Sequence, residues 1–282
     1  MLSSRDYQSL CADSGICMVA EMDTDYNVRT EQIAKANPTA DVYSIAKVFT
    51  ATAIGMCVDS GLLSVEDAFL DVMELPLPEG ADEKWKKVTI HMLLRHRFGI
   101  ATRGFLDIDA NDVSTYPTKD YLAMVLAQPL PEAQNGERVY TDAAYYLLSR
   151  VVEKVTGQTL FDFLRPTLMG TMDFAEYAWS ACPFGHTIGA SGLFVRCADV
   201  VKLGVLYLNG GVWKGTRVVS KTWCDTVLAQ EYDMYDDKNG WHHKGGMFGQ
   251  MLAIHPESGL AVAWTGHGQG KKLEQILCAD EN

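Results

Sequence analysis

Residues 44–61 read Ser-Ile-Ala-Lys-Val-Phe-Thr-Ala-Thr-Ala-Ile-Gly-Met-Cys-Val-Asp-Ser-Gly, the clearest structural signal in the chain. Apolar residues lie on almost every side of a helical projection, which predicts a buried helix over 44–60. Gly61 stands where a helix commonly ends, because glycine readily adopts the left-handed conformation. The uncharged apolar part, Val48–Val58, is far shorter than the roughly 20 residues that cross a bilayer. The stretch therefore predicts the central helix of a globular protein.

Ser44 and Lys47 are three residues apart, so a helix places them on one face. A serine at a helix N-terminus lies in a positive backbone field that favours a developing anion. A buried lysine loses its charge more easily, and its neutral amine can accept the serine proton. The spacing thus predicts an activated nucleophile. It is equally typical of an N-cap serine followed by a lysine that extends to solvent.

Tyr140-Thr141-Asp142 follows an expected turn at 134–137 and precedes an expected helix at 142–156. A loop position would let the Tyr140 hydroxyl face a cleft. Neighbouring cations would lower its pKa from about 10 and make it a proton shuttle. The alternative is local: Thr141 or Asp142 caps the helix and Tyr140 packs beside it.

His243-Lys244-Gly245-Gly246 lies just before an expected strand at 248–255. Paired glycines allow another group to approach the backbone closely, and their amides could donate to an oxyanion. A simple polar turn explains the same four residues.

Other residues bear on metals and on location. Four histidines gather late in the chain, but no His-Glu-x-x-His or comparable ligand spacing is present, so we expect no metal. The seven cysteines are scattered without a Cys-x-x-Cys pair, as buried free thiols of a reducing compartment are. The first residues lack a basic region followed by an apolar one, so we expect no secretory signal and a cytoplasmic location.

Composition bounds the remaining possibilities. The chain has 282 residues, 48% apolar and 21% charged, as expected of a globular protein with a sizeable core. A net charge of −12 disfavours binding to nucleic acids and to anionic membranes. Strand-like segments at both ends enclose helical ones, which predicts one sheet built from both termini and a helical insertion. The expected strands are 15–21, 28–34, 248–255 and 260–265, and the expected helices besides 44–60 are 3–13, 89–97, 118–128 and 142–156.

Three motifs occur in a telling order: Ser-x-x-Lys at 44–47, Tyr-x-Asp at 140–142 and His-x-Gly at 243–245. This order resembles the penicillin-recognising serine hydrolases. It is closest to their class C β-lactamase and esterase branch, which carries Ser-x-x-Lys, Tyr-x-Asn and Lys/His-x-Gly. The segment 91–100 is similar to the branch's Leu-Leu-x-His-x-Ser-Gly-Leu segment, and the likeness extends over roughly residues 15–265.

The resemblance implies an α/β (α+β) fold of the β-lactamase/transpeptidase type, an antiparallel sheet flanked by helices with an inserted helical lobe. We expect a single domain over 1–282. Residues 1–60 and 187–282 would form the sheet-and-helix lobe, and 61–186 the mainly helical lobe. The chain ends soon after the last expected strand, so a helix over 271–282 would be short.

The resemblance also implies roles for individual residues. Ser44 would be the acylated nucleophile, Lys47 its general base, and Tyr140 would share proton transfer to the leaving group and from the attacking water. The backbone N–H groups of Ser44 and Gly246 would form the oxyanion hole. His243 and Gly245 would line the neighbouring strand edge. Such chemistry needs no metal or organic cofactor, and it implies a small-molecule or short-peptide substrate; the oligomeric state is left open.

The sequence departs from the family pattern in three places. Asp142 stands where asparagine is usual, His243 stands where β-lactamases have lysine, and Arg97-Phe98 replaces a small polar pair. The first two changes make the cleft more acidic, which disfavours anionic substrates.

The sequence therefore predicts a serine hydrolase that cleaves an ester or amide, with β-lactam hydrolysis as a side activity. The alternative keeps the fold in a catalytically degenerate binding or sensor protein. A third reading is a cysteine or metal hydrolase of another fold.

Overall fold

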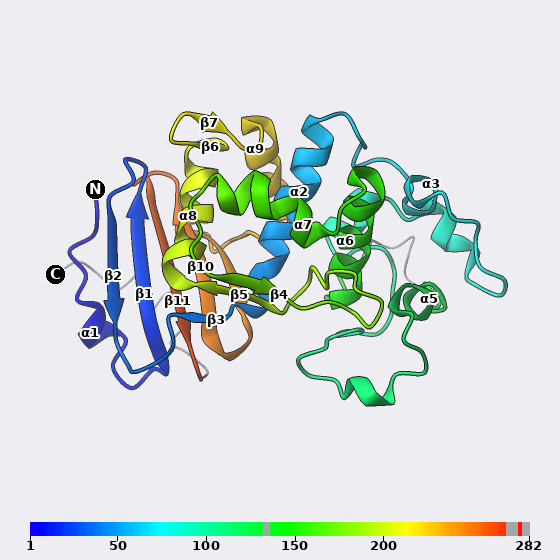
Figure 1. The fold of residues 1–282 in the computed structure, drawn as a ribbon, viewed down its shortest axis with the longest axis horizontal. Helices are drawn as coiled ribbons and strands as arrows, with labels where there is room; N and C mark the ends of the chain where they lie inside the picture. The colour runs from blue at the N-terminus through cyan, green and yellow to red at the C-terminus, as the bar shows by residue number, and fades with distance from the viewer. Residues whose placement is uncertain (132–135, 269–275, 278–282) are drawn as a thin grey trace. The chain divides into compact units, whose positions relative to one another are not determined.

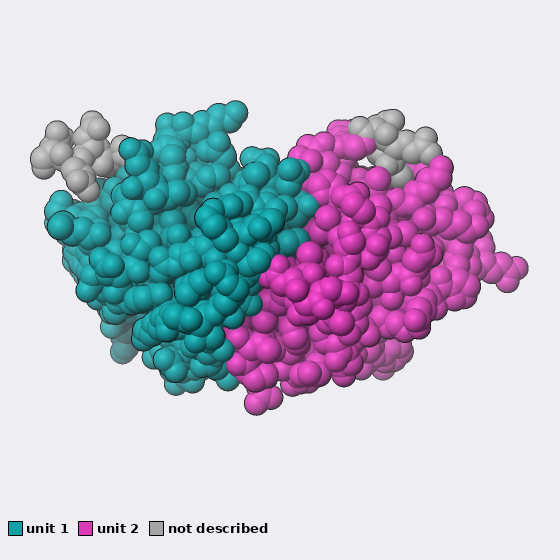
Figure 2. Space-filling model, turned by 90° about the horizontal axis from the view of Figure 1, so that it is seen from above, with its two compact units in different colours: residues 1–45, 169–178, 193–282 teal, residues 46–168, 179–192 magenta. Residues whose placement is uncertain are grey.

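The computed structural model describes residues 1–131, 136–268 and 276–277. The chain forms two compact units, coloured separately in Figure 2. Unit 1 comprises Met1–Ile45, Met169–Ala178 and Leu193–Asn282, and unit 2 comprises Ala46–Leu168 and Trp179–Gly192. The approximate lobe boundaries expected from the sequence stay a prediction.

Unit 1 is built on a six-stranded sheet in the order β2-β1-β11-β10-β9-β8 (Figure 1). Each neighbouring pair is antiparallel. The strands are β1 (Ile16–Asp23), β2 (Val28–Gln32), β8 (Tyr235–Asp236), β9 (His242–Gly246), β10 (Gln250–His255) and β11 (Leu260–Gly266). The first and last segments of the chain thus share one sheet, and the expected strands at both ends are confirmed.

Alternation along the strands gives this sheet two apolar faces. Helix α8 (Cys197–Leu208) covers one of them, where Gly204 packs against Ile254 and Ala261. The opposite face forms a core with α1 (Tyr7–Leu10). That core includes Tyr7, Val19, Trp241, Ala253, Val262 and Trp264. The central strands β1, β10 and β11 are therefore buried on both sides.

Smaller elements complete unit 1. A three-stranded sheet has the order β3-β5-β4, and β6 pairs with β7 in a short hairpin. Their bounds are β3 (Thr39–Asp41), β4 (Tyr177–Trp179), β5 (Leu193–Arg196), β6 (Val212–Trp213) and β7 (Thr216–Arg217), with helix α9 (Lys221–Gln230) and the single turns η1 (Tyr43–Ile45) and η5 (Met247–Gly249).

Unit 2 is helical and centres on two helices. Helix α2 (Ala46–Asp59) is buried along most of its length, as its apolar sequence predicts, and it contacts α6 (Asp142–Thr156). The Thr141 hydroxyl caps α6 and Gly157, at φ 72°, ends it. The other elements are α3 (Phe69–Met73), η2 (Glu83–Lys87), α4 (Ile90–Leu94), η3 (Val113–Thr115), α5 (Tyr121–Leu126) and α7 (Leu160–Leu164), and the turn η4 (Arg165–Gly170) leads back into unit 1.

Four expectations need correction or lie, wholly or in part, beyond the described residues. The helix expected over 3–13 is only the single turn α1. The helix expected over 118–128 begins at Tyr121 and is capped by Asp120, because the Thr118 hydroxyl accepts from the Asp120 amide instead. The C-terminal helix expected over 271–282, and residues 134–135 of the expected turn, fall outside the described residues.

The six described cysteines are all buried free thiols, as their apolar neighbours predict, and Cys278 lies outside the described residues. Within the described ranges, no helix has the length and apolar character needed to cross a bilayer.

The contact between Gly204 and the sheet yields a test. A Cβ at position 204 would lie 2.8 Å from the Ala261 Cβ and 2.9 Å from the Ile254 Cγ2. Gly204→Leu should therefore lower the free energy of unfolding by about 2 kcal/mol or more, although leucine favours helix. Urea unfolding measures this, with Ala198→Leu in the half-buried first turn of α8 as the control. An unchanged midpoint in Gly204→Leu would contradict the packing.

Candidate active site

Ser44 lies in the single turn η1, immediately before α2. The turn is sharp: Tyr43 has a φ of 48°, and its amide donates to the Asp41 carboxylate at 2.7 Å. The Val42 amide donates to the Leu193 carbonyl at 2.9 Å, which ties the turn to β5. Ser44 is half-buried and sits where the first amides of a helix point outward. The role of Ser44 as the nucleophile stays a prediction.

Gly246 ends β9 against the same turn. A Cβ at this position would lie only 2.5 Å from the Val42 carbonyl oxygen, so a side chain there would collide with backbone. Gly245 differs, because its nearest neighbours would be 3.8 Å away. Within unit 1, Gly246 is thus brought close to the chain two residues before Ser44.

His243 does not lie in a turn before a strand, as the sequence suggested, but inside β9, paired with Ala253. Side chains alternate along a strand, so His243 and Gly245 occupy the face opposite Lys244 and Gly246. Lys244 pairs with Leu252, whose side chain packs toward α8. Burial lowers the pKa of His243, which keeps its imidazole neutral near pH 7.

Lys244 is a residue that sequence reasoning missed. It is buried, forms an ion pair with Asp233, and lies on the same face of β9 as Gly246. The family pattern Lys/His-x-Gly is also matched by Lys244-Gly245-Gly246, one residue later than His243-Lys244-Gly245. That shift, visible in the sequence, changes which face of the strand carries the motif.

Lys47 is fully buried in unit 2. Its ammonium donates to the Asp142 carboxylate at 2.7 Å and to the Ala190 carbonyl at 2.8 Å. The lysine does not extend to solvent, so the snorkelling alternative is wrong. Asp142 is the first residue of α6, where the helix dipole favours its negative charge. Burial raises the pKa of Asp142, and the neighbouring Lys47 charge opposes that rise.

Tyr140 lies on the loop before α6, half-buried, as expected. The Lys47 ammonium is 4.9 Å from the centroid of its ring, and the His96 ring is 4.6 Å from it. The backbone around it is held at two points: the Val139 amide donates to the His96 carbonyl, and Gly104 donates to the Tyr140 carbonyl. Thr141 caps α6, as the local alternative expects, while Tyr140 faces Lys47. The role of Tyr140 in proton transfer stays a prediction.

Two further carboxylates surround Asp142. The carboxylate oxygens of Asp107, Asp109 and Asp142 lie within 4.8 Å of one another. Burial raises the pKa of Asp109, whose carboxylate also accepts from the Ser191 hydroxyl. A hard cation could be held at such a spacing, but Asp142 is already bonded to Lys47. Nothing in the local sequence around 107–109 singled these residues out.

The predicted site residues therefore fall into two groups. In unit 2, Lys47, Tyr140 and Asp142 come together. In unit 1, Gly246 comes close to the turn that carries Ser44, whereas the His243 side chain points to the other face of its strand. Ser44 and Lys47 remain three residues apart along one helical segment.

Comparison with known proteins agrees with this fold. The family model described as Beta-lactamase matches residues 25–277. The chain therefore belongs to the Beta-lactamase family, and its mixed α and β architecture is the β-lactamase/transpeptidase-like fold.

Three relatives illustrate the range of the family. The chain is 29% identical to penicillin-binding protein 4 of Amycolatopsis lactamdurans, over 80% of this chain and 71% of the relative. It is 26% identical to the 6-aminohexanoate-dimer hydrolase of Paenarthrobacter ureafaciens, over 66% of this chain and 50% of that protein. The structure of a class C β-lactamase from Rhodobacter sphaeroides matches with a TM-score of 0.69 at 16% identity, over 95% of this chain and 94% of the other. The last likeness concerns the fold alone.

The two glycines of β9 offer a matched test. Gly246→Ala should lower the free energy of unfolding by about 1 to 3 kcal/mol, because the new methyl group meets the Val42 carbonyl. Gly245→Ala should be tolerated, because its methyl group meets only ordinary contacts. Urea unfolding of both variants compares them, and equal losses would contradict the close approach at Gly246.

Proposed function

We propose that this chain is a serine hydrolase that cleaves an ester or amide through an acyl-enzyme on Ser44. Membership of the Beta-lactamase family supports hydrolase chemistry in general. The observation that carries the specific proposal is Lys47, fully buried three residues after Ser44 and held under the Tyr140 ring by Asp142 and the Ala190 carbonyl. An amine fixed in this way is suited to accept a proton from a neighbouring hydroxyl.

The proposed reaction has two stages. The Ser44 Oγ attacks the substrate carbonyl carbon while its proton passes to the Lys47 amine, and the N–H groups of Ser44 and Gly246 stabilise the oxyanion. Collapse breaks the bond to the leaving alcohol or amine, which takes up a proton with the help of Tyr140. Water then attacks the acyl-enzyme, again losing a proton through Tyr140 and Lys47, and releases the carboxylic acid and free Ser44.

Charge around Lys47 bears on the substrate. Asp107, Asp109 and Asp142 place three carboxylates near one ammonium group. A surplus of negative charge repels anionic substrates and favours neutral or cationic ones. We therefore expect small esters, amides or short peptides without a carboxylate close to the scissile bond. A cytoplasmic location also stays a prediction.

One observation favours a second candidate, a binding or sensor protein that has lost catalysis. The Asp142 carboxylate favours the protonated form of Lys47, and a permanently protonated amine cannot act as a base. The two candidates differ in whether Ser44 reacts with an acylating or phosphonylating probe.

The mass of the intact protein after incubation with a fluorophosphonate, and separately with a penicillin, tests the proposal. We expect a mass gain of one adduct from the fluorophosphonate and little or none from the penicillin, whose carboxylate meets an acidic surrounding. Ser44→Ala should abolish the gain, because it removes the nucleophile and little else.

The outcomes separate the candidates. A gain in wild type that vanishes in Ser44→Ala supports the hydrolase. No gain from either probe, with the protein folded, would favour the binding protein. A gain that persists in Ser44→Ala would place the reactive group elsewhere and overturn the mechanism.

A further inference from the structure

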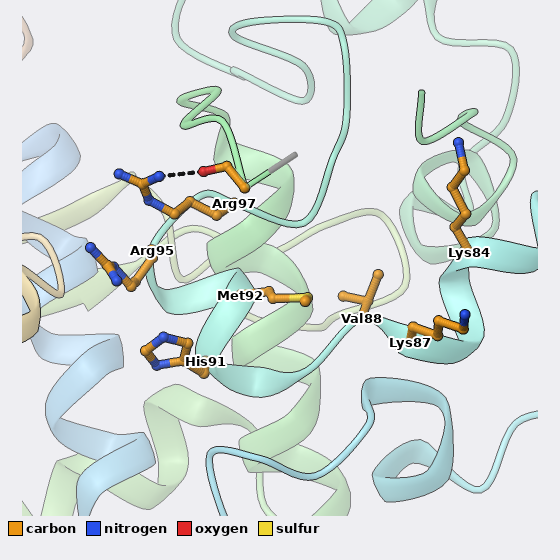
Figure 3. A pocket seen from close by; sticks show the side chains of 8 residues that line it. Lys84, Lys87, Val88, His91, Met92, Arg95 and Arg97 are labelled. Atoms are coloured by element: carbon orange, nitrogen blue, oxygen red, sulfur yellow. Dashed lines mark hydrogen bonds between the residues drawn. The ribbon is translucent and has the colours of Figure 1, made fainter. Parts of the chain in front are cut away.

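A cavity of about 470 Å³ lies in unit 2, and residues 84–97 supply most of its wall (Figure 3). Four cationic side chains line it, and two apolar ones lie among them. The cations are Lys84, Lys87, Arg95 and Arg97, and the apolar residues are Val88 and Met92. Figure 3 shows Arg95 on one side, Lys84 and Lys87 on the other, and Met92 and Val88 between them.

The lining of this cavity is positively charged, whereas the chain as a whole is negatively charged. The whole sequence carries −12, yet none of the described residues that line the cavity is a carboxylate. Lys84 donates to the Leu130 and Pro131 carbonyls, and Arg97 donates to the Gly136 carbonyl. Among the described residues, none of the four cations forms an ion pair with a carboxylate. Asp82 interacts electrostatically with Lys84, and Glu66 with His91. The positive charges of Lys87, Arg95 and Arg97 have no ion pair among the described residues, so an anionic ligand would relieve their mutual repulsion.

His91 also lines the cavity but supplies no fixed charge. Burial lowers the pKa of His91, Glu66 opposes this, and the nearby Arg95 lowers it further. The imidazole is thus neutral near pH 7. The fixed charge comes from the lysines and arginines alone.

The arrangement fits one class of ligand. The Gly136 carbonyl fixes the Arg97 guanidinium but uses only part of its five donors, so a planar fork remains for a carboxylate. Val88 is buried and Met92 half-buried, and methionine adapts its shape to apolar groups. The volume lies within the roughly 300 to 1,000 Å³ of pockets for organic ligands and exceeds what an inorganic ion fills.

We propose that this cavity is a binding site for an organic carboxylate with an apolar body. The carboxylate lies against Arg95 and Arg97, and the apolar body lies over Met92 and Val88. The site gives a role to Arg97, the departure from the family pattern that catalysis does not use. It does not depend on Ser44 chemistry.

Titration calorimetry of the full chain with octanoate tests the proposal. Octanoate should bind at one site per chain at low ionic strength. Octanamide, which has the same apolar body without the charge, and inorganic phosphate, which has charge without the apolar body, should both bind at least 10-fold more weakly. Phosphate binding as tight as octanoate would overturn the proposal, because the cavity would then be a general anion site.

Charge-removing variants locate the binding. Arg95→Gln and Lys87→Gln should each raise the dissociation constant of octanoate, the former about 10-fold because it removes a charge-assisted hydrogen bond. Neither side chain holds another part of the structure by an ion pair within the described residues, so each variant should fold. Lys119→Gln, an exposed lysine of unit 2 outside the cavity, is the matched control and should leave the affinity unchanged. Equal affinity in Arg95→Gln, Lys87→Gln and Lys119→Gln would place octanoate elsewhere and overturn the proposal.

Discussion

The ion pair between Lys47 and Asp142 is the constraint on which the helical unit and the proposed chemistry both depend. Neither charge reaches solvent, with 0% and 5% of the two side chains exposed. Removing one partner from such a buried pair costs about 3 to 5 kcal/mol, so the pair holds the start of α6 against α2. The same bond fixes the ammonium beside Tyr140 and makes that lysine harder to deprotonate. Position and reactivity of Lys47 are therefore set by one contact.

Within each unit, backbone contacts place the other predicted site residues. Tyr140 is aligned by His96, which accepts from the Val139 amide and stacks on the Tyr140 ring. In unit 1, the absence of a side chain at Gly246 lets β9 approach the turn before Ser44. Gly246 is placed by close packing of the backbone, and the Tyr140 loop is placed by backbone hydrogen bonds. In both cases, a backbone contact fixes the position of a residue to which the proposed mechanism assigns a role.

Local signals account for what the sequence could predict. Helix α6 was predicted over 142–156, and its bounds are confirmed, because Thr141 and Gly157 mark its ends within the chain itself. The features that the sequence could not predict depend on contacts between residues far apart in the chain. The carboxylates of Asp107 and Asp109 reach Asp142 from a loop more than 30 residues earlier, with no periodic pattern to reveal them. In β9 the residues His-His-Lys-Gly-Gly show no apolar alternation, so the sequence could not tell which face Lys244 would take. The neighbouring strand β10 settles that face through its register.

The most direct test of the account is the pH dependence of the rate at which a fluorophosphonate labels Ser44, measured in wild type and in Asp142→Asn. If Asp142 holds Lys47 in its protonated form, asparagine at this position makes the neutral amine available at lower pH. The rising limb of the profile should then move to lower pH by about one to three units. Asp120→Asn, at the half-buried N-cap of α5, is the charge-matched control and should leave the profile in place. An Asp142→Asn profile that coincides with wild type would contradict the claim that this ion pair governs the base.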